Sequence, residues 1–164
     1  SKIFNKLKIL RYAGTINKEK VIYPELNHKI DTLQSLILLE SYKNLNKIIG
    51  KRIDNANLYN KHLNQDIHKP YFSKKGDHIY YTYTILTKNR DKVKKYLTKN
   101  NIETQIQHPV IISQHPGLKN KFNNTKYFPK GRQIVKEILS LPIHEKLSKK
   151  EIFYVIKKIN KFLN

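Results

Sequence analysis

In NHKIDTLQSLILLE, residues 27–40, a short polar segment runs directly into an apolar one, and the architecture of the chain follows from this transition. Asp31 and Gln34 have the spacing of a capping box, in which the two side chains satisfy the free N–H groups of a helix start. From there, apolar residues recur every three or four positions, which predicts one long helix over residues 31–62. Gly50 is its weakest interior position, since glycine costs about 1 kcal/mol relative to alanine.

Shorter elements flank this helix on both sides. Residues 4–13 predict a short helix that Gly14 ends. Residues 78–86, HIYYTYTIL, alternate in a way that is typical of a strand. Further along, we expect a helix at 91–98 with a left-handed cap at Asn100 and Asn101, followed by a strand at 102–106. An irregular loop then runs to about residue 130, before a helix at 131–139 and an extended segment at 139–144. The last helix is expected to start at Ser148, where a second capping box pairs Ser148 with Glu151. This order predicts an α/β fold in which a small sheet is packed by helices and entered by a long helix.

The charge of the chain raises the question of a polyanionic partner. Lysine and arginine number 33 against 12 acidic residues, which gives a formal net charge of +21. Only four of the basic residues are arginines, which bind phosphate in the better bidentate geometry, and the lysines are spread along the whole chain. Lys, Asn, Ile and Tyr are abundant together, as in the products of AT-rich genomes. We therefore interpret most of the charge as compositional and do not expect nucleic acid as the main partner.

Several classes of site are excluded by composition and spacing. The chain has no cysteine, which excludes disulfides, thiolate metal sites and cysteine nucleophiles. Its seven histidines form no H-x-x-x-H pair, so we expect no metal site. There is also no P-loop, no G-x-G-x-x-G and no G-x-S-x-G motif, so nothing indicates a nucleotide-binding loop or a serine hydrolase. The longest uninterrupted aliphatic run, Leu36–Leu39, is far shorter than a membrane span. We expect a cytoplasmic protein that does not associate with membranes.

A set of short motifs follows one another in a fixed order. The segment GTINKEKVIYPELNHKIDTLQSLIL (14–38) precedes YYTYTILTKNRDKVKKYLTKNNIETQIQHPVIISQ (80–114), then YFP (127–129) and LSLPIHEKLSKKEI (139–152). This order resembles the C-terminal part of the DegT/StrS-type nucleotide-sugar aminotransferases, which show G-x-N-x-R before a helix, an H-x-Y strand, RD before a helix, gI-x-T-x-x-HYP and lSLPiHp. The resemblance covers nearly the whole chain and implies a fold-type I aminotransferase. It assigns residues 1–30 to the end of the large cofactor-binding domain and residues 31–164 to the small C-terminal α/β domain.

The resemblance implies roles for individual residues. Asn27 falls on the family's asparagine, which reaches across a dimer interface to the phosphate of the partner's pyridoxal 5'-phosphate. Lys29 falls on the arginine and keeps its charge without the fork geometry. Gln107 and His108 replace the His and Tyr of HYP, so these two residues and Lys29 are expected to bind substrate. Glu25 stands where the family has glycine, a departure that weakens the attraction for phosphate.

The resemblance also implies what the chain lacks. In the family, a lysine forms a Schiff base with the cofactor aldehyde and lies in an S-x-H-x-x-K segment upstream of the motifs seen here. We expect that segment to be missing, so the chain alone has no catalytic residue and is inactive. The complete enzyme would be a homodimer that moves an amino group, usually from glutamate, to a keto sugar on a nucleotide for polysaccharide biosynthesis.

Two alternatives stay open at this point. One is a basic α/β module that binds RNA or another polyanion and uses Tyr80, Tyr81 and Tyr83 to stack on bases. The other is an inactive structural remnant, which would expose apolar surface where a missing domain packs and would dimerise or aggregate.

Overall fold

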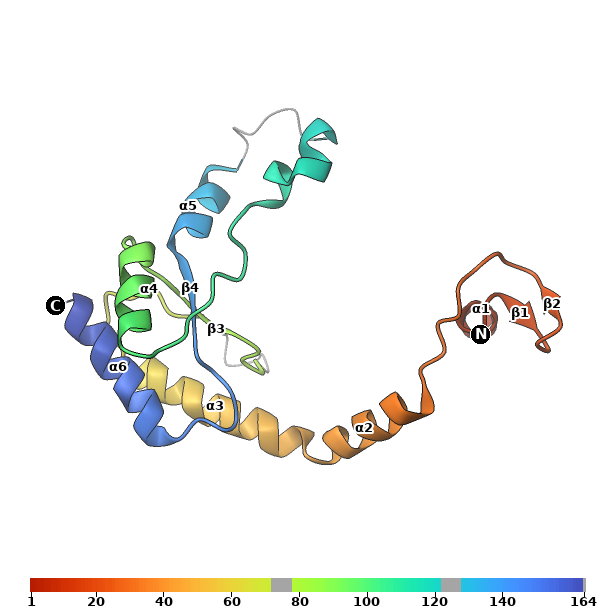
Figure 1. Ribbon diagram of the computed structural model, residues 1–164, viewed down its shortest axis with the longest axis horizontal. Helices are drawn as coiled ribbons and strands as arrows, with labels where there is room; N and C mark the ends of the chain where they lie inside the picture. Colours follow the sequence, from red (N-terminus) through yellow and green to blue (C-terminus); the bar gives the residue numbers. More distant parts are fainter. Residues whose placement is uncertain (72–77, 122–127, 164) are drawn as a thin grey trace. The chain divides into compact units, whose positions relative to one another are not determined.

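The computed structural model describes residues 1–71, 78–121 and 128–163 (Figure 1). The chain divides into two compact units, residues 1–45 and residues 46–164. Helices and small antiparallel sheets make up both units, so the predicted α/β class is confirmed. Tyr127 of the YFP motif lies outside the described residues.

The first unit contains a helix, a hairpin and a second helix, namely α1 (Lys2–Arg11), β1 (Thr15–Ile16), β2 (Lys20–Val21) and α2 (Thr32–Lys43). β1 and β2 pair antiparallel. Gly14 links α1 to this hairpin at a φ of +66°, and its carbonyl accepts hydrogen bonds from the backbone of Ile22 and Tyr23. A Cβ at position 14 would lie 1.8 Å from the Tyr23 carbonyl oxygen. Only glycine fits at this position, and its carbonyl holds residues 22 and 23, which follow β2, close to the end of α1.

The predicted long helix is in fact two helices. α2 ends at Lys43 and α3 (Leu45–His62) begins two residues later, after Asn44. The Asn44 backbone, at φ −98° and ψ 0°, donates to the Ser41 and Tyr42 carbonyls. Asparagine competes with helical hydrogen bonding through its short amide, whereas Gly50, the expected weak point, lies inside α3 without a break. The prediction of one continuous helix was therefore wrong.

The start of α2 also differs from the prediction. Asp31 occupies the N-cap position, but its side chain accepts no capping hydrogen bond, and the expected capping box with Gln34 does not form. Instead, the Ser35 hydroxyl donates to the Asp31 carbonyl at 2.9 Å. The capping box of the last helix is confirmed: Ser148 Oγ accepts from Glu151 N, and the Glu151 carboxylate accepts from Ser148 N at 2.8 Å.

The second unit continues with β3 (Tyr83–Leu86), α4 (Arg90–Lys99), η1 (Ile112–Gln114), η2 (Pro116–Lys121), α5 (Pro129–Glu137), β4 (Ile138–Leu141) and α6 (Lys149–Leu163). β3 and β4 pair antiparallel, with Tyr83 opposite Leu141. Single bridges extend this pair on both sides, from His68 to β3 and from Gln105 to β4. α4 and α6 lie side by side, as Figure 1 shows in green and dark blue.

The strand predicted over residues 78–86 forms only at its C-terminal half. Tyr80 has a φ of +46°, which breaks the extended backbone before β3. Tyr80 and Tyr83 are buried, while Tyr81 is 71% exposed. The idea that all three tyrosines present their rings to RNA bases was therefore wrong for Tyr80 and Tyr83. The strand predicted at 102–106 is likewise reduced to the bridge at Gln105.

A tyrosine pair joins α3 to the sheet in the core of the second unit. The Tyr59 and Tyr83 rings have centroids 4.8 Å apart. Tyr59 donates its hydroxyl to the Pro142 carbonyl at 2.9 Å, and Tyr83 donates to Asn60 Oδ1 at 2.7 Å. Burial raises the pKa of both phenols far above the usual value. These hydroxyls are therefore protonated donors that fix the helix against the strands.

Candidate functional site

Asn27 and Lys29 meet in one tight turn of the first unit. The Lys29 backbone N–H donates to Asn27 Oδ1 at 3.1 Å, which forms an Asx-type turn. The Asn27 backbone bridges to Tyr12, and the next N–H, of His28, donates to the Arg11 carbonyl at 3.1 Å. The turn is thus fixed against the end of α1. Within the described part of the chain, the Asn27 side-chain nitrogen has no hydrogen-bond partner, so its two N–H groups are free for a ligand.

Two lysines stand near this turn over the same aromatic ring. Lys29 Nζ lies 5.7 Å from the centroid of the Tyr12 ring, and Lys18 Nζ lies 5.9 Å from it. Since Tyr12 is bridged to Asn27, a neutral amide donor and two ammonium groups occur in one small region. This combination of donors suits a phosphate group. Lys18 was not predicted from the sequence, because residues 16–20, INKEK, give no clear sign of the hairpin that brings this lysine to Tyr12.

Glu25 adds a negative charge two residues before Asn27. Its carboxylate accepts hydrogen bonds from His28 Nε2 and from the Leu26 N–H, both at 3.1 Å. The hydrogen bond from His28 is the main cause that holds the pKa of Glu25 below its usual value. Glu25 is therefore ionised at neutral pH, and its carboxylate is hydrogen-bonded to His28. Its weakening effect on phosphate binding stays a prediction.

Gln107 and His108 lie in the second unit and line two different cavities. Gln107 lines a cavity of about 450 Å³, which we call the polar cavity, between residues 101–107, the end of β4 and the start of α6. His108 lines a cavity of about 700 Å³, which we call the apolar cavity, together with aliphatic residues of α5 and of the segment before η1. The structure therefore separates the two residues that sequence reasoning treated as one substrate-binding pair.

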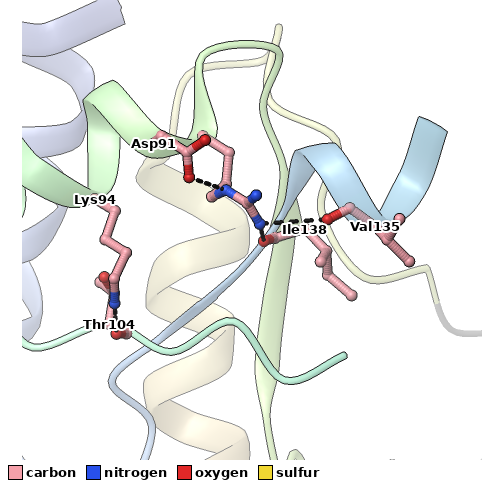
Figure 2. Close-up of polar contacts among 6 residues, drawn as sticks. Asp91, Lys94, Thr104, Val135 and Ile138 are labelled. Atoms are coloured by element: carbon pink, nitrogen blue, oxygen red, sulfur yellow. Dashed lines mark hydrogen bonds and ion pairs between the residues drawn. The ribbon is translucent and has the colours of Figure 1, made fainter. Parts of the chain in front are cut away.

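Two cationic side chains of α4 hold the walls of these cavities. Arg90 Nη1 donates to the Val135 and Ile138 carbonyls, both at 3.3 Å, at the junction of α5 and β4. One turn later, Lys94 Nζ donates to the Thr104 carbonyl at 2.7 Å. Figure 2 shows both contacts, with Lys94 reaching Thr104 and a separate group of dashed lines at Val135 and Ile138. These two side chains therefore position α5 and the segment that carries Gln107 and His108.

Sequence reasoning did not assign this positioning role to Arg90. A signal was available, because arginine is rare in the chain and a cation at the first residue of a helix opposes the helix dipole. A positive charge at this end of a helix therefore suggests that another group binds it, and here the Val135 and Ile138 carbonyls do so.

The described residues contain no group of three or more His, Asp or Glu side chains that could hold a metal ion. Among the same residues, no helix has both the length and the apolar character needed to cross a bilayer.

Comparison with known proteins identifies the class. The chain belongs to the DegT/DnrJ/EryC1/StrS aminotransferase family, which it matches over residues 1–160. It is 28% identical over 163 residues to dTDP-3-amino-3,6-dideoxy-alpha-D-galactopyranose transaminase of Aneurinibacillus thermoaerophilus, an alignment that covers 99% of this chain and 44% of the relative. The chain thus spans less than half the length of the curated relatives that it matches.

Solved structures show the same fold. DesV from S. venezuelae superposes with a TM-score of 0.93 at 23% identity, over 98% of this chain and 44% of that one. The sugar aminotransferase Spr1654 from Streptococcus pneumoniae, in its PMP form, superposes with a TM-score of 0.88 at 16% identity, over 98% and 43%. Aminotransferases of this family depend on pyridoxal phosphate, and Spr1654 is also known in a PLP form.

Proposed function

We propose that this chain is the C-terminal part of a pyridoxal-phosphate-dependent nucleotide-sugar aminotransferase. The observation that carries the proposal is the Asn27 turn, with its free amide beside Lys18 and Lys29, in a chain that matches the family over 1–160. On this proposal, residues 1–30 end the large cofactor-binding domain and residues 31–164 form the small domain.

The residues of the turn fit the phosphate end of the cofactor. Asn27 would donate its side-chain N–H groups to a phosphate oxygen, while its Oδ1 stays bound to the Lys29 backbone. Lys18 and Lys29, held over the Tyr12 ring, would offset the charge of the phosphate. When bound, pyridoxal phosphate supplies the electron-withdrawing ring that allows an amino group to pass between two carbon skeletons. The protein residues named here bind and orient; they carry no proton in that step.

The substrate and assembly are part of the same proposal. The relative from A. thermoaerophilus is a transaminase of a dTDP-linked amino sugar, which supports a nucleotide-sugar substrate. We assign Lys29, Gln107 and His108 to the substrate side, with an amino donor such as glutamate. We further propose a homodimer in which Asn27 serves the partner's cofactor, within a cytoplasmic enzyme of polysaccharide biosynthesis.

The surface of α2 supports a larger assembly. Its aliphatic side chains are 57–75% exposed, and none of its residues is buried in the described structure. They lie on more than one face of the helix: Leu33, Leu36, Ile37, Leu38 and Leu39. A helix that is apolar on all sides is normally covered on all sides. An inactive structural remnant would expose the same apolar surface. Only a measurement of cofactor binding or amino-group transfer therefore distinguishes a remnant from part of an aminotransferase.

Cofactor binding tests the proposed site. The chain is titrated with pyridoxal 5'-phosphate and with pyridoxal, which lacks the phosphate, while backbone amide shifts are followed by NMR. We expect the phosphorylated compound to shift the amide signals of residues 27–29. N27A should weaken the binding of that compound at least about tenfold, since a hydrogen bond to a charged group contributes about 1.5–3 kcal/mol. N57A, at an exposed asparagine of α3, is the matched control. An N27A variant that binds like the wild type would refute the site.

We also propose that this chain does not carry the catalytic lysine, which needs a separate test. The chain is incubated with pyridoxal 5'-phosphate, reduced with borohydride and digested for mass spectrometry. We expect only scattered, substoichiometric labelling of its many surface lysines, and no transfer of an amino group from glutamate. Stoichiometric labelling of one lysine would show that the chain carries its own catalytic residue.

A further inference from the structure

Exposed lysines line two neighbouring helices of the second unit, α4 and α6. Six of them form what we call the basic face: Lys92, Lys95 and Lys99 of α4 with Lys150, Lys157 and Lys161 of α6. These helices contain two carboxylates, and both are already bound. Asp91 pairs with Arg90 at 2.6 Å, and Glu151 accepts hydrogen bonds from Ser148. The basic face therefore keeps its full positive charge, since none of its six lysines has an ion-pair partner among the described residues.

Contacts between the helices show which side of α4 its lysines occupy. The Tyr96 and Phe162 rings have centroids 5.1 Å apart, so Tyr96 marks the side of α4 that faces α6. Lys92 and Lys99 lie one turn before and one turn after Tyr96 and share that side. Both lysines are exposed, whereas Val93 on the inner side of α4 is buried. The lysine row of α4 therefore borders α6 on the solvent side.

The lysines of α6 border the same seam. Tyr154 donates its hydroxyl to the Asn100 carbonyl directly after α4, and Lys158 donates to the Asn100 amide oxygen at 2.6 Å. Lys150 lies one turn before Tyr154, and Lys161 lies one turn after Lys158. This row is about 16 Å long, and the two helix axes are about 8–10 Å apart. Since that separation is close to a Debye length of about 8 Å at physiological salt, the two rows act together on a partner that spans both.

The chemistry of the basic face suits a lipid surface better than a nucleic acid. It contains no arginine, whose guanidinium fork matches single phosphates, and its lysines are point charges on flexible stems. Along the seam it offers one aromatic ring, the 45% exposed Tyr154, whereas sites for single-stranded RNA stack bases on several rings. Lysine stems and tyrosine rings are both common in the headgroup region of a bilayer. A group of about four to eight basic side chains on an amphipathic helix is typical of binding to anionic lipids.

We propose that the basic face binds the surface of an anionic lipid bilayer. Its six lysines bind the phosphate and carboxylate groups of the lipid headgroups, and Tyr154 lies at headgroup level between the two rows. The expectation that the protein does not associate with membranes rested on the lack of a spanning segment, which this mode of binding does not need. The proposal uses α4 and α6 alone, so it is independent of the Asn27 turn and of amino-group transfer.

Co-sedimentation of the full chain with lipid vesicles tests the proposal. Vesicles of phosphatidylcholine are compared with vesicles of equal parts phosphatidylcholine and phosphatidylserine. We expect binding to the anionic vesicles alone, and its loss when salt rises from about 0.1 M to about 1 M, because the Debye length falls from about 10 Å to about 3 Å. Equal binding to both kinds of vesicle, or none to either at about 0.1 M salt, would overturn the proposal. Polyuridylate is the nucleic-acid probe, and tighter binding of polyuridylate than of anionic vesicles, at equal concentration of negative charge, would overturn it in favour of RNA.

Variants separate the basic face from the net charge of +21. K157Q/K161Q should lower the affinity for anionic vesicles about 25-fold, since each lysine near such a surface contributes about fivefold. K47Q/K51Q, at exposed lysines of α3, removes the same charge and is the matched control. It should change the affinity less than about twofold, because salt screens lysines that do not contact the surface. An equal loss in both variants would show that net charge alone drives the binding, and the basic face would then have no part in it.

A tryptophan reporter tests the contact itself. The chain has no tryptophan, so Y154W contributes a single emission band. We expect this emission to shift to the blue on binding to anionic vesicles, since the ring leaves water for the headgroup region. Y71W, at a 91% exposed tyrosine outside the basic face, is the control and should keep its emission. An unshifted emission from vesicle-bound Y154W would place the contact elsewhere and overturn the proposal. None of these results bears on the Asn27 turn, which is tested by pyridoxal 5'-phosphate.

Discussion

Replacing Arg90 with alanine tests whether one side chain holds α5 to the rest of the second unit. The Arg90 guanidinium donates from Nη1 to the Val135 and Ile138 carbonyls, which close the end of α5. The side chain is only 12% exposed. Alanine leaves these two carbonyls without their donor and removes the packing of the arginine stem.

The expected loss follows from this geometry. A hydrogen bond to a charged group contributes about 1.5–3 kcal/mol, but both bonds here are 3.3 Å long and share one nitrogen, so we count them as one strong bond. The ion pair from Arg90 Nε to Asp91, at 2.6 Å, adds little because Asp91 is 81% exposed. We therefore expect R90A to lower the free energy of unfolding by about 2 kcal/mol, or the melting temperature by about 8 °C.

Urea unfolding followed by circular dichroism measures this difference. R90K keeps the positive charge and should recover about half of the loss, since an ammonium group can donate to one of the carbonyls. D91N is the matched control and should cost less than about 0.5 kcal/mol. The reasoning is refuted if R90A unfolds within about 0.5 kcal/mol of the wild type, or if D91N is as destabilising as R90A.

The remaining predictions concern the hairpin, the core and the last helix. G14A should abolish hydrogen-exchange protection in the β1–β2 hairpin, because its Cβ would lie 1.8 Å from a backbone carbonyl oxygen, whereas G50A, with nothing within 4 Å, should stabilise α3 by about 1 kcal/mol. Y59F should lower the free energy of unfolding by about 1 kcal/mol, since the Pro142 carbonyl loses its donor at 2.9 Å; an unchanged urea midpoint would contradict this. Hydrogen bonds from the Ser148 backbone and side chain hold the pKa of Glu151 below its usual value. The stabilisation by Glu151 is therefore complete above that usual value and is lost as the pH falls through the lowered pKa, and E151Q should remove that part of the acid sensitivity.

Local sequence signals identified the elements that depend on local chemistry. The capping box of α6 formed because Ser148 and Glu151 lie in the same first turn. The apolar periodicity likewise found α1, α4 and α6 within one or two residues of their ends. Asn44 and Tyr80 were missed, since each changes the backbone direction through a single residue that the surrounding pattern conceals.

The residues of the candidate site likewise fall into those that local motifs revealed and those whose partners are distant in the sequence. Order and spacing of motifs singled out Asn27 and Lys29, which are neighbours in the chain and do meet in one turn. Lys18 and Arg90 were missed because their partners are distant in sequence and come close only through a hairpin and through the packing of α4. Sequence also could not show that Gln107 and His108 line separate cavities.

Periodicity and side chains a few positions apart were thus enough to predict the α/β class, while the order of the motifs along the chain carried the resemblance to the family and singled out Asn27 and Lys29. The tertiary structure was needed to show which side chains are buried, which distant carbonyls Arg90 and Lys94 bind, and that Gln107 and His108 line separate cavities. The physical reason is that burial and electrostatic environment are properties of surfaces assembled from separate segments, and no local pattern encodes them.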